Sequence, residues 1–168
     1  MRVNDVGLKE LHLREGLRLK PYLDTKGIPT IAMGNTYYLD NREVTMKDPE
    51  LSPREANKLS QLITDDFGKH VNSKVTSAIN QNQFNALVSI AYNIGKAGFS
   101  SSTFLKLINK NPNGPKIADA IMMWTKDKEL ITRRISEMKQ YFSNVPSQQI
   151  KSLELKYVAI YKVYKKIL

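Results

Sequence analysis

Two acidic residues near the N-terminus are of the type that cleavage of a glycosidic bond uses. Glu15 precedes Gly16 at the end of a short amphipathic segment, and Asp24 follows nine residues later in a turn. A hydroxyl group, that of Thr30, lies on the next β-rich stretch. Glycoside hydrolysis needs one carboxyl kept protonated as an acid and another kept ionised, so two carboxylates in unlike surroundings suit it. By turn statistics the commoner interpretation of these residues is a helix end and an Asx turn, and spacing alone does not decide for the chemical one.

The elements that must position these residues are a short helix and a small sheet. A helix is predicted over residues 4–15, with Asn4 or Asp5 as its cap and Gly16 as its end. Residues 24–27 form a predicted turn, in which Gly27 can adopt a positive φ. Residues 28–33 are rich in β-forming side chains. We therefore expect a sheet of two or three strands between residues 21 and 48.

The rest of the chain is predicted to be helical. Ser52, Pro53 and Glu55 have the order of an N-cap, a first helical residue and the end of a capping box. Further helices are expected over residues 84–91, ended by Gly95, and after the capping residues 100–103. Two more are expected over 115–124 and 131–142, and Ser147 is a cap for a last one. The predicted fold class is α+β, mostly α, with a small β-containing lobe and a larger helical lobe.

Composition limits the chemistry that is available. The 168 residues include no cysteine, which excludes disulfides, thiol nucleophiles and thiolate metal sites. His12 and His70 are the only histidines and provide almost no material for a zinc site. The 26 basic and 16 acidic residues give a net charge of +10, which favours a polyanionic partner such as nucleic acid, a bacterial wall or a membrane surface. No apolar run approaches the roughly 18 residues of a spanning helix.

Five stretches of the chain share an order and an approximate spacing with one known family. They are residues 15–27 with Thr30 and Ile31, residues 82–95, residues 99–103, Trp124, and residues 133–137 with the pattern Arg-Arg-x-x-Glu. The first resembles the active-site signature of the phage-type lysozymes, the endolysin muramidases. The others resemble that family's central helix, its cleft-facing helix start, its tryptophan and its arginine motif. The resemblance extends over residues 10–142, which is most of the chain.

The resemblance implies a lysozyme-like two-lobe fold and an activity. A muramidase cuts the β-1,4 bond between N-acetylmuramic acid and N-acetylglucosamine in peptidoglycan and so lyses bacteria. By position, Glu15 is the general acid, Asp24 the second carboxylate, and Thr30 the residue that places the attacking water. The resemblance implies a mechanism that inverts the configuration of the anomeric carbon, which requires a separation of roughly 6.5–9.5 Å between the two carboxyl groups. The resemblance assigns support of Glu15 to Arg134 and contact with the sugar chain to Tyr92, Asn93 and Ser102. No cofactor and no metal are implied.

We expect a single lysozyme-like domain over residues 1–168. Its parts are a small lobe over about 1–50, a connecting helix over about 51–75, a helical lobe over about 76–142, and an extra segment over about 143–168. That last segment has an apolar helical stripe surrounded by lysines. It is either a helix that packs on the helical lobe or a basic amphipathic helix that attaches to an anionic envelope surface.

Two positions depart from the family pattern. Ala32 stands where the family usually has glycine, so we expect this position to have a negative φ. Asn35 replaces a residue that often supports the hairpin. Glu15, Asp24 and Thr30 are unaffected by these departures.

Two other functions compete with hydrolysis. One is a catalytically inactive wall-binding or scaffold protein with the same fold, and the other is a basic helical protein that binds nucleic acid. The spread of basic residues along the chain, without a basic arm, argues against the second. The first residues contain no signal-peptide core, which predicts a protein made in the host cytoplasm that reaches the wall after release. We also expect the protein to be a monomer.

Overall fold

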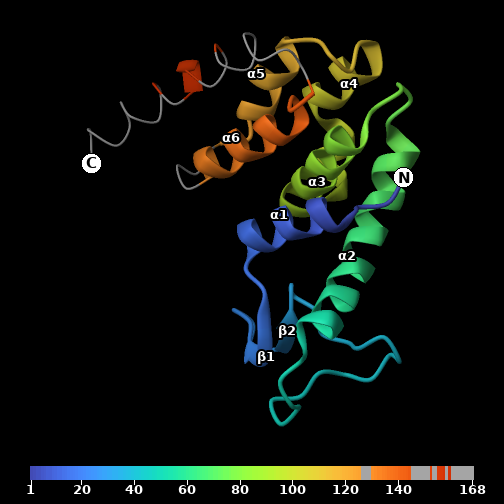
Figure 1. Ribbon diagram of the computed structural model, residues 1–168, viewed down its shortest axis with the longest axis vertical. Helices are drawn as coiled ribbons and strands as arrows, with labels where there is room; N and C mark the ends of the chain where they lie inside the picture. The colour runs from blue at the N-terminus through green and yellow to red at the C-terminus, as the bar shows by residue number, and fades with distance from the viewer. Residues whose placement is uncertain (126–129, 145–151, 153–154, 158, 160–168) are drawn as a thin grey trace. The chain divides into compact units, whose positions relative to one another are not determined.

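The computed structural model describes residues 1–125, 130–144, 152, 155–157 and 159. These residues form two units. Figure 1 shows the chain coloured by residue number. The β unit comprises residues 2–67, and the helical unit comprises Met1 and the described residues from Gly68 onward. The boundary falls inside helix α2 (Pro53–Lys74), which contributes residues to both units. The α+β, mostly helical fold class is confirmed, whereas the division into four segments of a single domain stays a prediction.

Helix α1 (Asp5–Glu15) has the predicted boundaries for the predicted reasons. The side chain of Asn4 caps it and accepts a hydrogen bond from the N–H of Gly7 at 3.0 Å. Gly16 ends the helix with φ +80°, a conformation that favours glycine, and its N–H donates to the carbonyl of His12 at 2.9 Å. The chain therefore leaves α1 directly after Glu15.

The sheet consists of two antiparallel strands, β1 (Arg18–Leu23) and β2 (Pro29–Ala32). Tyr22 lies opposite Thr30 and Arg18 lies opposite Ala32, with a register shift between Arg18 and Tyr22. The prediction that strand structure begins at Pro21 was wrong, because β1 begins at Arg18. Pro21 lies within the register shift, where its missing N–H donor is tolerated.

A compact apolar cluster holds the strands against α2 within the β unit. Its buried members are Ile31, Ala32, Val44, Ala56 and Leu59, and partly buried leucines and Tyr38 pack around them. Asn35 links the hairpin to α2, since its buried side-chain amide donates to the carbonyl of Leu59 at 3.1 Å. The capping box that starts α2 is confirmed by reciprocal hydrogen bonds between Ser52 and Glu55.

Ala32 does not have the expected backbone conformation. Its φ is +53°, in the left-handed region, and its side chain is buried with 1% exposure. The expectation of a negative φ was wrong because the tight turn from β2 to Asn35 imposes the left-handed geometry. Reciprocal backbone hydrogen bonds of 2.9 Å join Ile31 and Asn35 across this turn. Alanine thus takes a conformation for which glycine is better suited.

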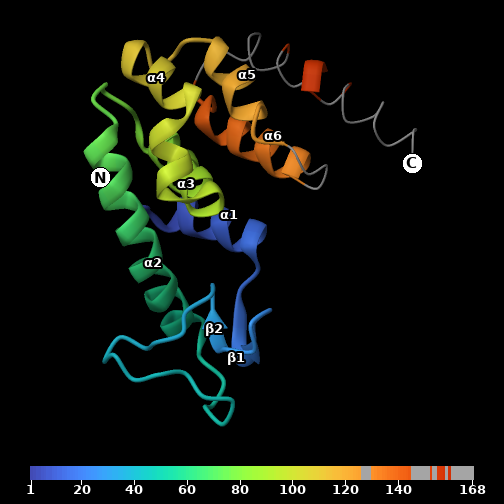
Figure 2. The ribbon, with the colours of Figure 1, turned by 180° about the vertical axis from the view of Figure 1, so that it is seen from behind.

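The helical unit contains four helices besides the end of α2. They are α3 (Gln81–Ser101), α4 (Thr103–Lys110), α5 (Lys116–Met122) and α6 (Leu130–Tyr141). Helix α3 packs against α6 and α4, and α5 packs against both α4 and α6, as Figure 2 shows from behind. Gly95 interrupts α3 with φ +78° and ψ +160°, which confirms it as a helix breaker. None of the helices in the described residues is long and apolar enough to span a membrane.

The segment predicted over residues 143–168 is only partly within the described residues. Ser147 and most of the lysines of this segment lie outside them. Tyr157 is buried, and its hydroxyl donates to Asp119 at the surface of α5. Lys156 pairs with the same carboxylate at 2.7 Å, and these contacts lower the pKa of Asp119, that with Lys156 most strongly. The contacts at Lys156 and Tyr157 fit the packing alternative.

The left-handed conformation at position 32 predicts an unusual order of stabilities. Ala32→Val should destabilise the protein by about 2 kcal/mol, because a β-branched side chain is strained at positive φ and overfills a buried site. Ala32→Gly should stay close to the wild type, because relief of about 1 kcal/mol of backbone strain offsets the loss of about 0.8 kcal/mol from one buried methyl group. Urea unfolding of both variants measures the difference. A valine variant as stable as the glycine variant would refute the left-handed assignment.

Candidate active site

Glu15 is the last residue of α1 and is partly buried. Because Gly16 turns the chain out of the helix at once, the Glu15 side chain is held at the junction between α1 and the sheet. This is the helix-end placement that the sequence predicted for the candidate acid.

Asp24 stands at the start of the turn between β1 and β2. Its Oδ1 accepts the N–H groups of Lys26 and Ile28, each at 2.8 Å, so the Asx-turn interpretation is confirmed. The main chain closes the same turn, since the N–H of Asp24 donates to the carbonyl of Ile28 at 3.0 Å. The carboxylate's hydrogen bonds within the described part of the chain use Oδ1, which leaves Oδ2 for water or a ligand. A turn role and a chemical role are therefore compatible.

Thr30 is a buried residue of β2, with 2% exposure. Its Oγ1 donates to the carbonyl of Ile28 at 2.9 Å. Since the hydroxyl proton is committed to this bond, the lone pairs of Oγ1 are directed to act as acceptors. A hydroxyl in this state can receive a hydrogen bond from water.

Ile28 connects Asp24 to Thr30, a role that the sequence did not predict. Its N–H holds the carboxylate of Asp24, and its carbonyl receives both the N–H of Asp24 and the hydroxyl of Thr30. Its own side chain is 43% exposed and carries no chemistry. The only available signal was its position midway between the turn and the strand, because the contribution comes from its main chain. Asp24 and Thr30 are thus fixed relative to each other by one residue.

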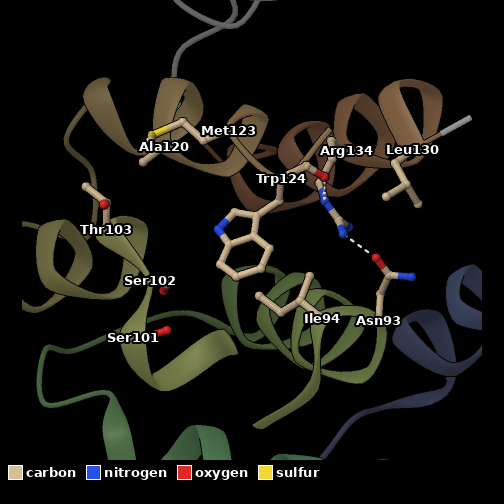
Figure 3. Close-up of a pocket in the computed structure, with 10 residues that line it drawn as sticks. All are labelled: Asn93, Ile94, Ser101, Ser102, Thr103, Ala120, Met123, Trp124, Leu130 and Arg134. Atoms are coloured by element: carbon tan, nitrogen blue, oxygen red, sulfur yellow. Dashed lines mark hydrogen bonds between the residues drawn. The ribbon is translucent and has the colours of Figure 1, made fainter. Parts of the chain in front are cut away.

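The helical unit has a pocket of about 650 Å³, which Figure 3 shows. Three of the predicted site residues line it: Asn93, Ser102 and Arg134. Tyr92 is partly buried but is not among the lining residues. The rest of the lining consists of Ile94, Ser101, Thr103, Ala120, Met123, Trp124 and Leu130. The pocket therefore combines an aromatic ring with short polar groups, a mixture that suits a saccharide or a peptide.

Trp124 provides the largest aromatic surface of this pocket, and its indole ring stands at the centre of the lining residues in Figure 3. The ring packs closely on Gly98 of α3, where an added Cβ would come within 3.1 Å of the indole. Glycine at this position therefore lets the ring approach the helix. Ser102 confirms its predicted role as the cap of α4, since its Oγ accepts the N–H of Leu105 at 3.2 Å.

Arg134 belongs to a buried ionic network. Its guanidinium is fully buried and donates to the carboxylate of Glu137, to the side-chain carbonyl of Asn93 and, at 3.2 Å, to the main-chain carbonyl of Trp124. Figure 3 shows Arg134 directed toward Asn93. Glu137 is also fully buried and accepts from Ser89 at 2.6 Å and from Arg133 at 3.0 Å.

The sequence did not predict that Arg134 pairs with Glu137, or that Ser89 of α3 donates to the same carboxylate. The Arg-Arg-x-x-Glu spacing places Glu137 three and four residues after the two arginines, on one side of a helix, and was the available signal. The structure thus groups Asp24, Thr30 and the helix-end Glu15 in the β unit. It groups Arg134, Asn93 and Ser102 around the pocket of the helical unit.

Comparison with known proteins identifies the family. The family model for phage lysozyme matches residues 12–137. The endolysin of Salmonella phage P22 is 37% identical over 129 residues, which cover 75% of this chain and 85% of that protein. The chain belongs to the phage lysozyme family. Glu15, Asp24, Thr30 and Arg134 of this lysozyme all lie within the matched residues.

Solved structures agree with the fold of the lysozyme. A mutant of P22 lysozyme superposes with a TM-score of 0.78 at 32% identity, over 84% of this chain and 99% of that one. The endolysin of Escherichia coli O157:H7 phage FAHEc1 gives a TM-score of 0.75 at 31% identity, over 86% and 96% of the two chains. The lysozyme is therefore a glycoside hydrolase that acts on peptidoglycan. Nothing in these comparisons favours a nucleic-acid-binding or a purely wall-binding role.

The buried network predicts that Glu137→Gln destabilises the lysozyme strongly, by about 3 kcal/mol or more. The substitution keeps the shape of the side chain but leaves the Arg134 charge buried without its counter-ion. Ser89→Ala, which removes one hydrogen bond to the same carboxylate, should cost less, about 2 kcal/mol. Chemical unfolding of the two variants gives the comparison. Equal losses would mean that the ion pair is no more important than the hydroxyl contact.

Proposed function

We propose that this lysozyme hydrolyses the β-1,4 bond between N-acetylmuramic acid and N-acetylglucosamine with inversion, using Glu15, Asp24 and Thr30. The proposal rests mainly on the shared anchoring of Asp24 and Thr30 on Ile28. That anchoring fixes a carboxylate with one open oxygen relative to a hydroxyl whose lone pairs are available. In this proposal the two groups hold one water molecule between them, and Glu15 at the end of α1 is the general acid.

The reaction proceeds in one displacement. Glu15 transfers its proton to the glycosidic oxygen while the bond from that oxygen to the anomeric carbon breaks. A water molecule held by Thr30 and Asp24 attacks the anomeric carbon from the opposite face, and its proton passes to the Asp24 carboxylate. The products are two shorter chains, and proton exchange with solvent restores both carboxyl groups. The new reducing end has the α configuration at first.

The helical unit contributes substrate contacts in this proposal. Asn93 and Ser102 contact the sugar chain from the pocket that they line, beside the indole of Trp124. Tyr92 is the third proposed contact, and its half-buried ring is the kind of surface that sugars stack on. The role of Arg134 in supporting Glu15 stays a prediction, since the two residues belong to different units.

We infer that the lysozyme acts as a monomer that is made in the host cytoplasm and reaches the wall after release. Lysines of residues 143–168 would then attract it to an anionic envelope surface. The net charge of +10 supports attraction to anionic polymers of the wall.

The acid role predicts the outcome of one substitution. Glu15→Gln should lower the rate of reducing-end release from purified cell walls by at least about 100-fold, because an amide cannot donate the proton. The matched control is Glu10→Gln on the same helix, which makes the same chemical change at a residue that pairs with Arg14. This control should keep nearly the full rate. An active Glu15→Gln enzyme would remove Glu15 from the mechanism.

The water-positioning role predicts a difference between two substitutions of Thr30. Thr30→Ser keeps a hydroxyl and should retain most of the activity, whereas Thr30→Val has the same shape without it and should lose about tenfold in kcat, the value of one good hydrogen bond. NMR of the freshly formed reducing end should show the α anomer with wild type and Thr30→Ser. The β anomer as first product would exclude inversion.

A further inference from the structure

The β unit contains two arginine side chains stacked on tyrosine rings, and they differ in charge balance. The guanidinium carbon of Arg18 lies 4.4 Å from the centre of the Tyr22 ring, and that of Arg42 lies 4.2 Å from the centre of the Tyr38 ring. Arg42 is neutralised by Asp48, whose carboxylate accepts from it at 2.9 Å. The pKa of Asp48 is lowered to about 2, chiefly by the main-chain N–H of Thr45. Arg42 is thus part of a closed structural cluster.

Arg18 has no such carboxylate. Among the described residues no acidic side chain lies within ion-pair distance of its guanidinium, and the residue is exposed. The neighbouring basic residue of the same strand, Lys20, is paired with Glu50 at 3.5 Å. Strand β1 therefore presents one cation that is held in place by an aromatic ring but is not neutralised.

The register of the sheet places this cation beside the proposed catalytic groups. Tyr22 pairs directly with Thr30. Side chains at directly opposite positions of an antiparallel pair lie on the same face and close together. The ring that carries Arg18 is therefore the immediate neighbour of the residue that is proposed to hold the attacking water.

A stacked guanidinium is well suited to one class of ligand. The contact with the ring holds the group in place, and its N–H edge can form two parallel hydrogen bonds to a carboxylate. Peptidoglycan provides such carboxylates, because the peptides attached to its muramic acid residues carry free carboxyl groups. The glycan backbone between those peptides is uncharged. We propose that Arg18, held on Tyr22, binds a carboxylate of the stem peptide and so favours peptide-bearing strands as substrate.

This inference rests on the proposed function, since it places the contact next to the proposed water site. Its test compares two substrates that differ only in charge. Gram-negative sacculi, which lack teichoic acid phosphates, are used either native or after carbodiimide coupling has converted their peptide carboxyl groups to amides. Initial rates of reducing-end release are measured at several wall concentrations for wild type, Arg18→Gln and a charge-matched control.

The control is Lys47→Gln, which removes one positive charge from an exposed residue of the same unit. Wild type and this control should cleave amidated walls about tenfold less efficiently than native walls. Arg18→Gln should be about tenfold less efficient than wild type on native walls, through a higher apparent KM at similar kcat, and should no longer distinguish the two substrates. Arg18→Lys keeps the charge but not the planar group and should fall between them.

Three results would overturn the inference. The first is an Arg18→Gln enzyme that still prefers native walls as strongly as wild type does. The second is a Lys47→Gln enzyme with the same loss, since general attraction between charges would then explain the effect. The third is equal cleavage of native and amidated walls by wild type, and this result needs no variant to fold. A wild-type enzyme that is inactive on both substrates would instead contradict the proposed function.

Discussion

A carboxylate without access to solvent determines how the helical unit is put together. Moving Glu137 out of water costs several kcal/mol, and this cost is offset only if every polar contact in the network is made. The two arginines that meet this need lie on its own helix, while Ser89 reaches it from α3. The network therefore joins α3 to α6 at defined residues. Arg134 also holds Asn93 and the carbonyl of Trp124, so the lining of the pocket depends on this packing.

The β unit achieves its geometry by a different physical means. Asp24 and Thr30 are held by hydrogen bonds to main-chain groups within a short stretch of sequence, from Asp24 to Thr30, rather than by buried charges. Such a turn forms locally and needs little from the apolar cluster behind it. The helical unit thus depends on a desolvated ionic network, whereas the β unit depends on a locally closed turn. The first is sensitive to loss of a single partner, whereas the second tolerates changes of side chain wherever only the main chain takes part.

The features that the sequence predicted correctly are those with local causes. Contacts within four residues start or stop helices at Asn4, Gly16, Ser52 and Ser102, and all were among the predicted caps and ends. The predicted break at Gly95 is a kink inside α3. The start of β1 and the φ of Ala32 were wrong, because pairing with β2 and the turn to Asn35 decide them. The buried contact of Glu137 with Ser89 and the role of Ile28 were not predicted. The first depends on a contact between helices distant in sequence, and the second depends on main-chain atoms that carry no signature of residue type.

The position of Trp124 has a practical consequence for spectroscopy. It is the only tryptophan in the 168 residues, and it stands in the lining of the pocket with its ring against Gly98. Emission excited at the red edge of protein absorption therefore originates from that pocket alone, without competing indoles elsewhere. The chain also contains no cysteine, so a single introduced thiol could be labelled as an energy acceptor without a background reaction. Ligand entry into the helical unit thus has a built-in optical reporter that leaves the native sequence unchanged.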